Sequence, residues 1–322
     1  MFVIVLKQSQ KSGFNINSYL TAWIEQYLFF PNILQKLISV CMFPFTIIYC
    51  IVVAYKRTSS RAFDFGINVV SIGNLVVGGS GKTPITIALA KKEENPAIVL
   101  RGYGRSSKGM YVISKNGQIL EDISTSGDEA MLLAKTLKNA TIIVSENRAN
   151  GVIKAKELGC NIVFLDDGYR HHNIKKFDIL IRPKDEPTNL FCLPSGGYKE
   201  TKMMYSFVPL VLKDGVDFKR IVSFSRNGEK VNTLPSKIIL LSAISKPNRL
   251  LEYLPANTKT ISYYDHYNYT QSDIDNIKSK YPQYTIVTTQ KDMVKLEKFN
   301  IENIIQMDLD IDIIKEFSYK FI

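Results

Sequence analysis

The sequence has few of the residues that build disulfide frameworks or zinc sites. Its 322 residues include only four cysteines and three histidines. The cysteines show no paired metal spacing, so a disulfide framework is not expected, and a reducing compartment fits this composition. The small number of histidines limits any zinc site built on histidine. The cysteines are Cys41, Cys50, Cys160 and Cys192.

Negative charge is also in short supply. The chain carries 30 Asp and Glu residues against 41 Lys and Arg residues, which gives a net charge of +11. A positive charge of this size favours an anionic partner: nucleic acid, an anionic lipid surface or a phosphorylated substrate. The length is sufficient for one large or two modest domains with a real core.

Charged residues are absent from one long stretch near the N-terminus, residues 37–55. This stretch is about long enough for a helix to cross a bilayer core, and Pro44 within it is tolerated better in membrane helices than in soluble ones. Lys56 and Arg57 follow directly, which by the positive-inside tendency places the rest of the chain in the cytoplasm. A buried core helix and an interfacial helix that does not cross are the alternatives. Residues 19–36 have helical spacing and aromatic side chains suited to a membrane interface.

The rest of the chain is organised around a glycine-rich loop that lies between an apolar strand and a helix. Residues 69–72 and 75–77 have strand character, and the segment from Ile85 is a good helix start. Such a loop points its N–H groups at an anion beside the helix N-terminus. Lys82 would reach the β- and γ-phosphates of a nucleotide, and the Thr83 hydroxyl would hold Mg²⁺. The predicted nucleotide-binding residues are Gly78, Gly79, Ser80, Gly81, Lys82, Thr83 and Pro84.

The match to the phosphate-loop pattern is partial, because Val76 stands where the full pattern has a glycine. A bare glycine turn is therefore the alternative. A second acidic strand end is needed to hold Mg²⁺, and residues 162–165 supply an apolar strand that ends in Asp166 and Asp167.

From about residue 68 the chain alternates between strands and helices, which predicts a mostly parallel sheet covered by helices. The regularity weakens after about residue 187, where a second α/β lobe is expected. The predicted strands are 68–71, 97–100, 141–144, 161–165 and 177–181, followed by 237–242, 285–289 and 304–307. The predicted helices are 128–138, 147–158, 271–280 and 311–319.

Several further segments are candidates for chemistry. Asp128 and Glu129 open a helix, either as simple N-terminal acids or with one of them as a general base. His266 could assist Asp128 if the fold brings them together. The segment 101–105 pairs glycines with arginines and suits an anionic group. The segments 193–200 and 290–292 are plausible pocket edges, although the second is equally explained as a solvated turn.

Other nucleotide-binding classes fit less well. A GTPase is disfavoured because residues 289–292 lack the spacing that reads guanine. A membrane ATPase of the partitioning type is a closer rival, but it places a signature lysine where this chain has Val77. A nucleic-acid ATPase does not explain the apolar run, and a non-enzymatic binding module does not need both Lys82 and the two aspartates.

Taken together, the motifs resemble the tetraacyldisaccharide 4′-kinase family, the lipid A kinases of Gram-negative bacteria. The matching segments follow the family's order and cover nearly all of the chain after residue 65. They are residues 71–84, 101–105, 127–130, 166–171, 193–200, 265–266 with 269–270, and 288–292.

The resemblance implies ATP-dependent phosphorylation of the 4′-hydroxyl of a tetraacylated glucosamine disaccharide 1-phosphate at the cytoplasmic face of the inner membrane. It implies ATP and Mg²⁺ as cofactors, an anionic membrane surface as partner and no nucleic acid. The implied fold is a P-loop NTPase-like α/β lobe and a second, smaller α/β lobe joined by a β-ribbon, with an N-terminal membrane helix. The predicted parts are residues 1–60, 61–205 and 206–322.

The resemblance also assigns roles to individual positions. Lys82 and Asp128, the latter as base and assisted by His266, carry over as catalytic residues. The implied metal or supporting ligands are Thr83, Asp166, Asp167, Glu129 and Glu200, and the candidate substrate contacts are Arg101, Asn74 and Tyr103.

The chain departs from the family pattern at four positions. The family usually has His, Glu, Gln and Arg where this chain has Tyr267, Gln290, Arg170 and Lys199. These departures keep His266 but change the contacts expected around it.

Overall fold

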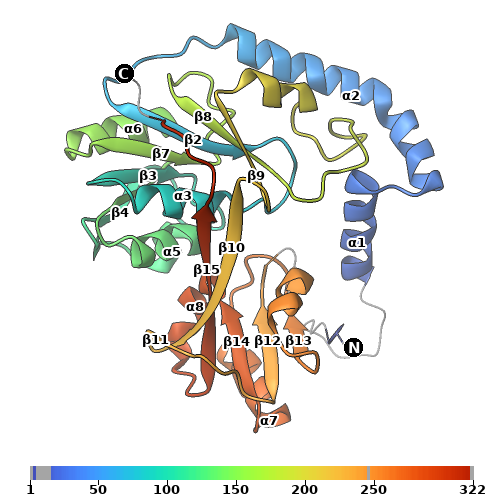
Figure 1. Cartoon of the computed structure of the whole chain (residues 1–322), viewed down its shortest axis with the longest axis vertical. Coiled ribbons are helices and arrows are strands. Elements are labelled where there is room, and N and C mark those ends of the chain that lie inside the picture. Colours follow the sequence, from blue (N-terminus) through green and yellow to red (C-terminus); the bar gives the residue numbers. More distant parts are fainter. Residues whose placement is uncertain (1–2, 5–15, 245–246, 320–322) are drawn as a thin grey trace.

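The computed structural model describes residues 3–4, 16–244 and 247–319. Figure 1 shows two lobes joined by a long two-stranded ribbon, with a helical arm that runs over the upper lobe. Residues 1–2 and 5–15 of the predicted N-terminal segment lie outside the described residues.

The upper lobe is built on an eight-stranded sheet that is parallel except around β4, which pairs antiparallel with both neighbours. Its central strands are continuous apolar runs, as expected for strands buried on both faces. In spatial order they are β5 (Gln118–Ile119), β4 (Tyr111–Lys115), β6 (Thr141–Val144), β3 (Pro96–Leu100), β7 (Ile162–Asp166), β2 (Asn68–Asn74), β8 (Phe177–Arg182) and β9 (Leu210–Lys213).

Helices cover both faces of this sheet. Apolar side chains of α3 and α5 pack on one face and those of α6 on the other. Parallel pairing aligns the carboxyl ends of β2 and β7, so the segments that follow these strands lie side by side. The helices are α3 (Lys82–Ala90), α4 (Ile123–Ser126), α5 (Asp128–Thr136) and α6 (Arg148–Glu157).

The lower lobe has a seven-stranded sheet with its own apolar layers on both faces. In spatial order its strands are β1 (Val3–Ile4), β13 (Lys259–Ser262), β12 (Ile238–Ser242), β14 (Thr285–Thr289), β15 (Ile304–Ile313), β10 (Phe218–Arg226) and β11 (Glu229–Lys230). Its helices are α7 (Gln271–Lys280) and α8 (Gln290–Leu296), and the chain also has 3-10 turns η1 (Lys202–Phe207), η2 (Pro247–Tyr253) and η3 (Glu297–Phe299).

The ribbon between the lobes consists of β10 and β15, which pair antiparallel from Phe218–Ile313 to Ser225–Gln306. Beyond β15 the chain reaches the upper lobe, where the Tyr319 ring lies 6.1 Å from the ring of Phe164. The sheets therefore cross the predicted part boundaries: β9 lies beyond residue 205 but belongs to the upper sheet, and β1 belongs to the lower sheet. The three-part division stays a prediction.

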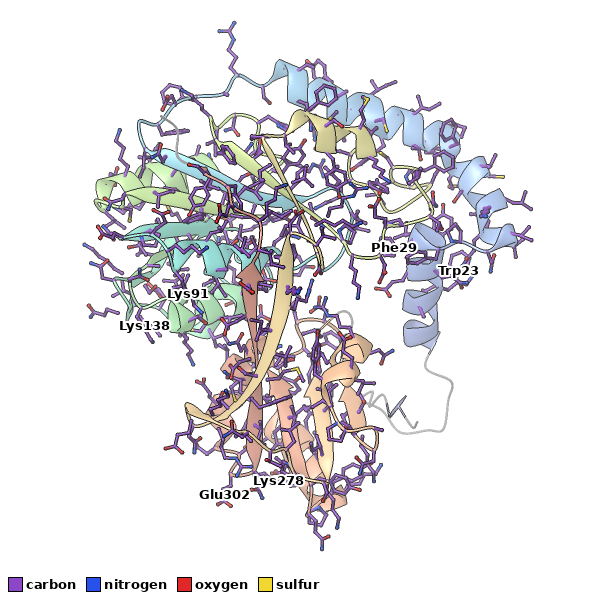
Figure 2. All side chains as sticks on the ribbon, in the orientation of Figure 1. Trp23, Phe29, Lys91, Lys138, Lys278 and Glu302 are labelled. Atoms are coloured by element: carbon purple, nitrogen blue, oxygen red, sulfur yellow. The ribbon has the colours of Figure 1, made fainter. Side chains whose placement is uncertain are left out.

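The arm consists of α1 (Ile16–Phe29) and α2 (Ile33–Ser59), so the predicted helical stretch 37–55 lies inside α2. The helical spacing over 19–36 is interrupted, because Pro31 separates the two helices and Asn32 caps α2 with a capping box to Gln35. Figure 2 shows Trp23 and Phe29 on α1, near the bend into α2.

Two local predictions are wrong. Residues 311–319 do not form a helix, because β15 continues to Ile313 and residues 314–319 are irregular. The alternation of apolar and acidic residues from Met307 to Ile313 has the period of a strand, and each of these residues pairs with β10. Residues 75–77 do not continue the strand: Leu75 and Val76 are buried and Val77 is half-buried, but all three lie beyond β2, and Val76 makes only an isolated bridge to Tyr198.

Candidate active site

The glycine-rich loop follows β2 and ends at the first residue of α3. Gly78 and Gly81 have φ angles of 96° and 86°, which favour glycine at both positions. Gly81 is the N-cap of α3, and Pro84 lies in the first turn, where its missing N–H costs nothing. The Ser80 hydroxyl is buried and has no hydrogen-bond partner among the described residues. The loop therefore offers unpaired donors to an anion at the helix N-terminus.

The two carboxylates at the end of β7 lie beside this loop. Thr83 donates its hydroxyl to Oδ2 of Asp166 over 2.7 Å. Nζ of Lys82 lies 3.7 Å from Oδ1 of Asp167. Asp167 has a φ of 52°, so the chain turns sharply directly after the strand. The sequence-predicted loop and carboxylates thus share one site.

Asp166 is a buried carboxylate, and one of its two oxygens lacks a hydrogen-bond partner among the described residues. Burial, reinforced by the negative charge of Glu129, raises the pKa of Asp166 to about 6, although the Thr83 hydrogen bond and Lys82 act in the opposite direction. Its Oδ1 atom is buried and has no hydrogen-bond partner among the described residues. A buried, unpaired carboxylate oxygen beside a threonine hydroxyl is a donor set suited to a hard cation.

A second pair of side chains joins the two lobes. Asp128 begins α5 in the upper lobe, and His266 lies in the lower lobe after β13. Nδ1 of His266 is 3.1 Å from both carboxylate oxygens of Asp128. Burial alone would raise the pKa of Asp128, but the hydrogen bond from His266 and the charge of Lys291 outweigh it and lower that pKa. Asp128 is therefore held as a carboxylate.

Asn74, at the end of β2, links two lysines to the loop. Its Oδ1 atom accepts from Lys199 over 2.8 Å and from Lys82 over 3.3 Å. Lys199 also lies 3.6 Å from Asp167, and burial, which outweighs the attraction of that carboxylate, lowers the pKa of Lys199 to about 8. Asn74 was predicted as a substrate contact, whereas Lys199 lies in the predicted pocket edge 193–200 and had no predicted role.

The remaining predicted residues separate into two groups. Tyr103 is exposed and its ring lies 4.8 Å from that of His266, and Arg101 is exposed on the same loop. Glu200, by contrast, pairs with Arg57 at the end of α2 and lies 4.0 Å from Arg170. The structure thus gives Glu200 cationic partners and no contact with Thr83 or Asp166 among the interactions of the described residues.

Sequence reasoning missed two lysines of α8, a helix that packs directly on α5. Nζ of Lys291 lies 3.8 Å and Nζ of Lys295 lies 3.7 Å from Oδ2 of Asp128. The sequence interpretation of residues 290–292 as a charged pocket edge pointed to this region without a role. A lysine has no local motif that reports a partner from another lobe.

Comparison with known proteins decides between the classes that the sequence left open. The family model described as tetraacyldisaccharide-1-P 4′-kinase matches residues 38–321. The chain belongs to this kinase family. It is 58% identical to the tetraacyldisaccharide 4′-kinase of Aliarcobacter butzleri over 90% of this chain and 92% of that protein. It is 40% identical to the enzyme of Helicobacter acinonychis over 90% and 91% of the two chains.

A solved structure agrees with the family assignment. The crystal structure of LpxK from Aquifex aeolicus in complex with ATP matches this chain with a TM-score of 0.69 and 25% identity. The match covers 85% of this chain and 95% of the other. The predicted family, fold class and kinase activity are confirmed, and the partitioning-type ATPase is not favoured.

Proposed function

We propose that this kinase binds ATP and its lipid substrate in one site. The glycine-rich loop holds the triphosphate, and Asp128 faces the 4′-hydroxyl of the disaccharide. The observation that carries this proposal is the Asp128–His266 pair, 3.1 Å apart and drawn from different lobes. Asp128 is the neighbour of Glu129, whose charge acts on Asp166 beside the loop. A base therefore lies next to the phosphate site, as phosphoryl transfer to an alcohol requires.

In this proposal ATP binds with its phosphates against residues 78–84. Backbone N–H groups of the loop, at the N-terminus of α3, donate hydrogen bonds to the phosphate oxygens. Lys82 adds a positive charge at the β- and γ-phosphates. Lys199 lies beside Lys82, since both contact Asn74 and Asp167, and it adds a second cation on the same side. The proposed contacts for the sugar are Tyr103, whose ring lies 4.8 Å from that of His266, and Arg101, which is exposed on the same loop.

The residues around Asp166 fit Mg²⁺. Thr83 and Asp166 would hold the ion, with Asp167 and Glu129 as neighbouring carboxylates, and the unpaired Oδ1 of Asp166 supports this choice. Bound Mg²⁺ would neutralise charge on the phosphoryl group in transfer. Glu200 is not part of this proposal, because its carboxylate is held by Arg57.

Asp128 is the proposed proton acceptor. The 4′-oxygen forms a bond to the γ-phosphorus as the bond to the bridging oxygen of ADP breaks, and the hydroxyl proton passes to the Asp128 carboxylate. His266 donates a hydrogen bond that orients this carboxylate, and the lowered pKa keeps it ionised before transfer. In-line transfer of this kind depends mainly on positioning and charge.

The lipid substrate requires contact with a membrane, and α2 supplies the surface. It is a helix long and apolar enough to cross a bilayer. However, polar side chains along one face bind the upper lobe: Ser39 donates to Ser195 O over 2.7 Å, and Tyr49 donates to Lys199 O over 2.9 Å. Arg57 closes this seam at Glu200.

The seam and the opposite face of α2 favour an interfacial position. From Ser39 to Arg57 the helix follows the upper lobe for about 27 Å, which leaves too little free length to span a bilayer. Its other face exposes an apolar stripe, formed by Leu34, Leu37, Val40, Phe45, Ile48, Ile51 and Tyr55. We infer that this stripe lies in the cytoplasmic leaflet of the inner membrane, where the net charge of +11 favours anionic headgroups.

The direct test is incubation of the purified full-length protein with ATP, Mg²⁺ and the tetraacylated disaccharide 1-phosphate in mixed micelles, followed by mass spectrometry of the lipid. The expected product gains one phosphoryl group at the 4′-position. ATP hydrolysis without modified lipid would contradict the proposal and favour a partitioning-type ATPase.

A further inference from the structure

Lys291 occupies a cage of acceptors between the two lobes. Its Nζ atom lies 3.3 Å from Nε2 of His266 and 3.4 Å from Oδ1 of Asp265 in the lower lobe. On the upper lobe it lies 3.6 Å from Glu129 and 3.8 Å from Asp128. Only 17% of the side chain is exposed. One ammonium group therefore touches every side chain of the proposed proton-accepting cluster.

The place of Lys291 in α8 is explained by these contacts and not by the helix. Thr289 caps α8, so Lys291 lies in the first turn, where the helix dipole disfavours a cation. Three carboxylates, those of Asp128, Glu129 and Asp265, lie within 3.8 Å of its Nζ atom and favour the charged form. Lys291 is therefore an ammonium group, which can donate hydrogen bonds and cannot accept one.

This donor-only character determines the imidazole of His266. If Lys291 donates to Nε2, that nitrogen must carry a lone pair, and the ring hydrogen of a neutral imidazole is then on Nδ1. Nδ1 is the atom that lies 3.1 Å from both oxygens of Asp128. In that arrangement Lys291 donates to His266 and His266 donates to Asp128, while Oδ1 of Asp265 lies farther from Nε2, at 3.9 Å.

We propose that Lys291 is a positioning residue that fixes His266 in the tautomer with its hydrogen on Nδ1, so that the imidazole orients Asp128 and leaves the substrate proton to this carboxylate. The inference rests on the proposed role of Asp128 as base. It adds that the lower lobe sets the hydrogen-bond direction of the base through two residues, His266 and Lys291, which approach from separate segments.

The neighbouring lysine does not share this role. Nζ of Lys295 lies 3.1 Å from Asp292 and 3.7 Å from Asp128, and it stands over the ring of Tyr269. No contact joins Lys295 to His266 among the interactions of the described residues. Lys298 is a simpler comparison, because it is exposed and lies against the ring of Phe299.

The test is the ring nitrogen spectrum of the full-length protein labelled with ¹⁵N-histidine, in detergent, without ATP or lipid, at about pH 8. The chain has only three histidines, and the spectrum of His266→Gln identifies the signals of the third. Wild type is expected to show His266 as the Nδ1–H tautomer. Lys291→Met is expected to convert it to the doubly protonated imidazolium or to the Nε2–H form, because Nε2 then loses its donor while Oδ1 of Asp265 remains 3.9 Å away, and to lower kcat about tenfold or more. Lys291→Arg should retain the wild-type tautomer, because the guanidinium is also a donor only.

Lys298→Met, which removes the same charge from the exposed surface, should leave the tautomer unchanged. A wild-type His266 in the Nε2–H or doubly protonated form would overturn the proposal, and so would an unchanged tautomer in Lys291→Met. The spectrum requires no turnover, so failure of the tautomer assignment is distinguishable from failure of the kinase assay. If Lys291→Met does not fold, a wild-type or Lys291→Arg spectrum with His266 in any form other than Nδ1–H still overturns the proposal.

Discussion

Thr83 donates a hydrogen bond to Asp166 although the two residues are 83 positions apart in the chain. The contact exists because β2 and β7 are parallel neighbours whose carboxyl ends coincide. It marks the point where the glycine-rich loop meets the two carboxylates at the end of β7.

Replacing Thr83 by Val should lower kcat/KM with ATP by about 10²-fold, because the variant loses a hydroxyl ligand for Mg²⁺ while it keeps the side-chain volume. Thr83→Ser should retain most of the activity. The measurement is initial rate against Mg²⁺ concentration, and an unchanged metal dependence in Thr83→Val would contradict the metal assignment.

Lys82→Ala should abolish detectable phosphoryl transfer, since the loop then loses its point charge at the phosphates. Lys91 is the matched control because it follows the same helix, lies on the surface (Figure 2) and pairs with exposed Asp310 over 2.9 Å. Lys91→Ala should change turnover by less than about twofold. A radiolabelled-ATP assay compares them, and normal turnover by Lys82→Ala would refute the loop assignment.

Asp128→Asn should lower kcat by about 10²–10⁴-fold and leave ATP binding nearly unchanged. His266→Gln should have a smaller effect, and the double variant should be little worse than Asp128→Asn, because both residues act on one proton transfer. Turnover and nucleotide affinity are measured separately. A pure KM effect of Asp128→Asn would show that this residue positions substrate instead of accepting its proton.

Lys295→Met should destabilise the protein by about 3–5 kcal/mol, since it leaves the fully buried carboxylate of Asp292 without its cation. Lys298→Met, on the exposed surface, should stay within about 0.5 kcal/mol of wild type. Denaturant unfolding provides the comparison. Equal stability of both variants would mean that the Asp292–Lys295 pair contributes nothing to the fold.

Ile48→Glu and Ile51→Glu should each weaken binding to anionic vesicles by about tenfold, because the apolar stripe of α2 then carries a charge into the interface. Ile153→Glu is the control, since Ile153 is 43% exposed but lies on α6, away from α2 (Figure 1). Vesicle sedimentation measures the effect. Full retention of the double variant on vesicles would place membrane contact on another surface.

The sequence was most informative where a site is contiguous. The loop around Lys82 and the strand end at Asp166 could be recognised from local patterns, and their order predicted a shared edge. The Asp128–His266 contact spans 138 positions and depends on how two lobes meet, so it followed only from the family resemblance. Lys199 and Lys291 lie in the segments 193–200 and 290–292, which were predicted as pocket edges without roles, and Lys295 was not predicted at all, because a lysine looks alike on a solvated face and in a buried cage. The wrong prediction of a helix over residues 311–319 could have been avoided, because apolar and acidic residues alternate through β15 with the period of a strand.

The ribbon of β10 and β15 ties the geometry of catalysis to the elasticity of two paired strands. Asp128 belongs to the body at one end of this ribbon, and His266 and Lys291 belong to the body at the other end. Any bend or twist along the ribbon therefore changes the distances from the proposed base to both of its partners at the same time. The relative orientation of the two lobes and the geometry of the proposed proton transfer therefore change together.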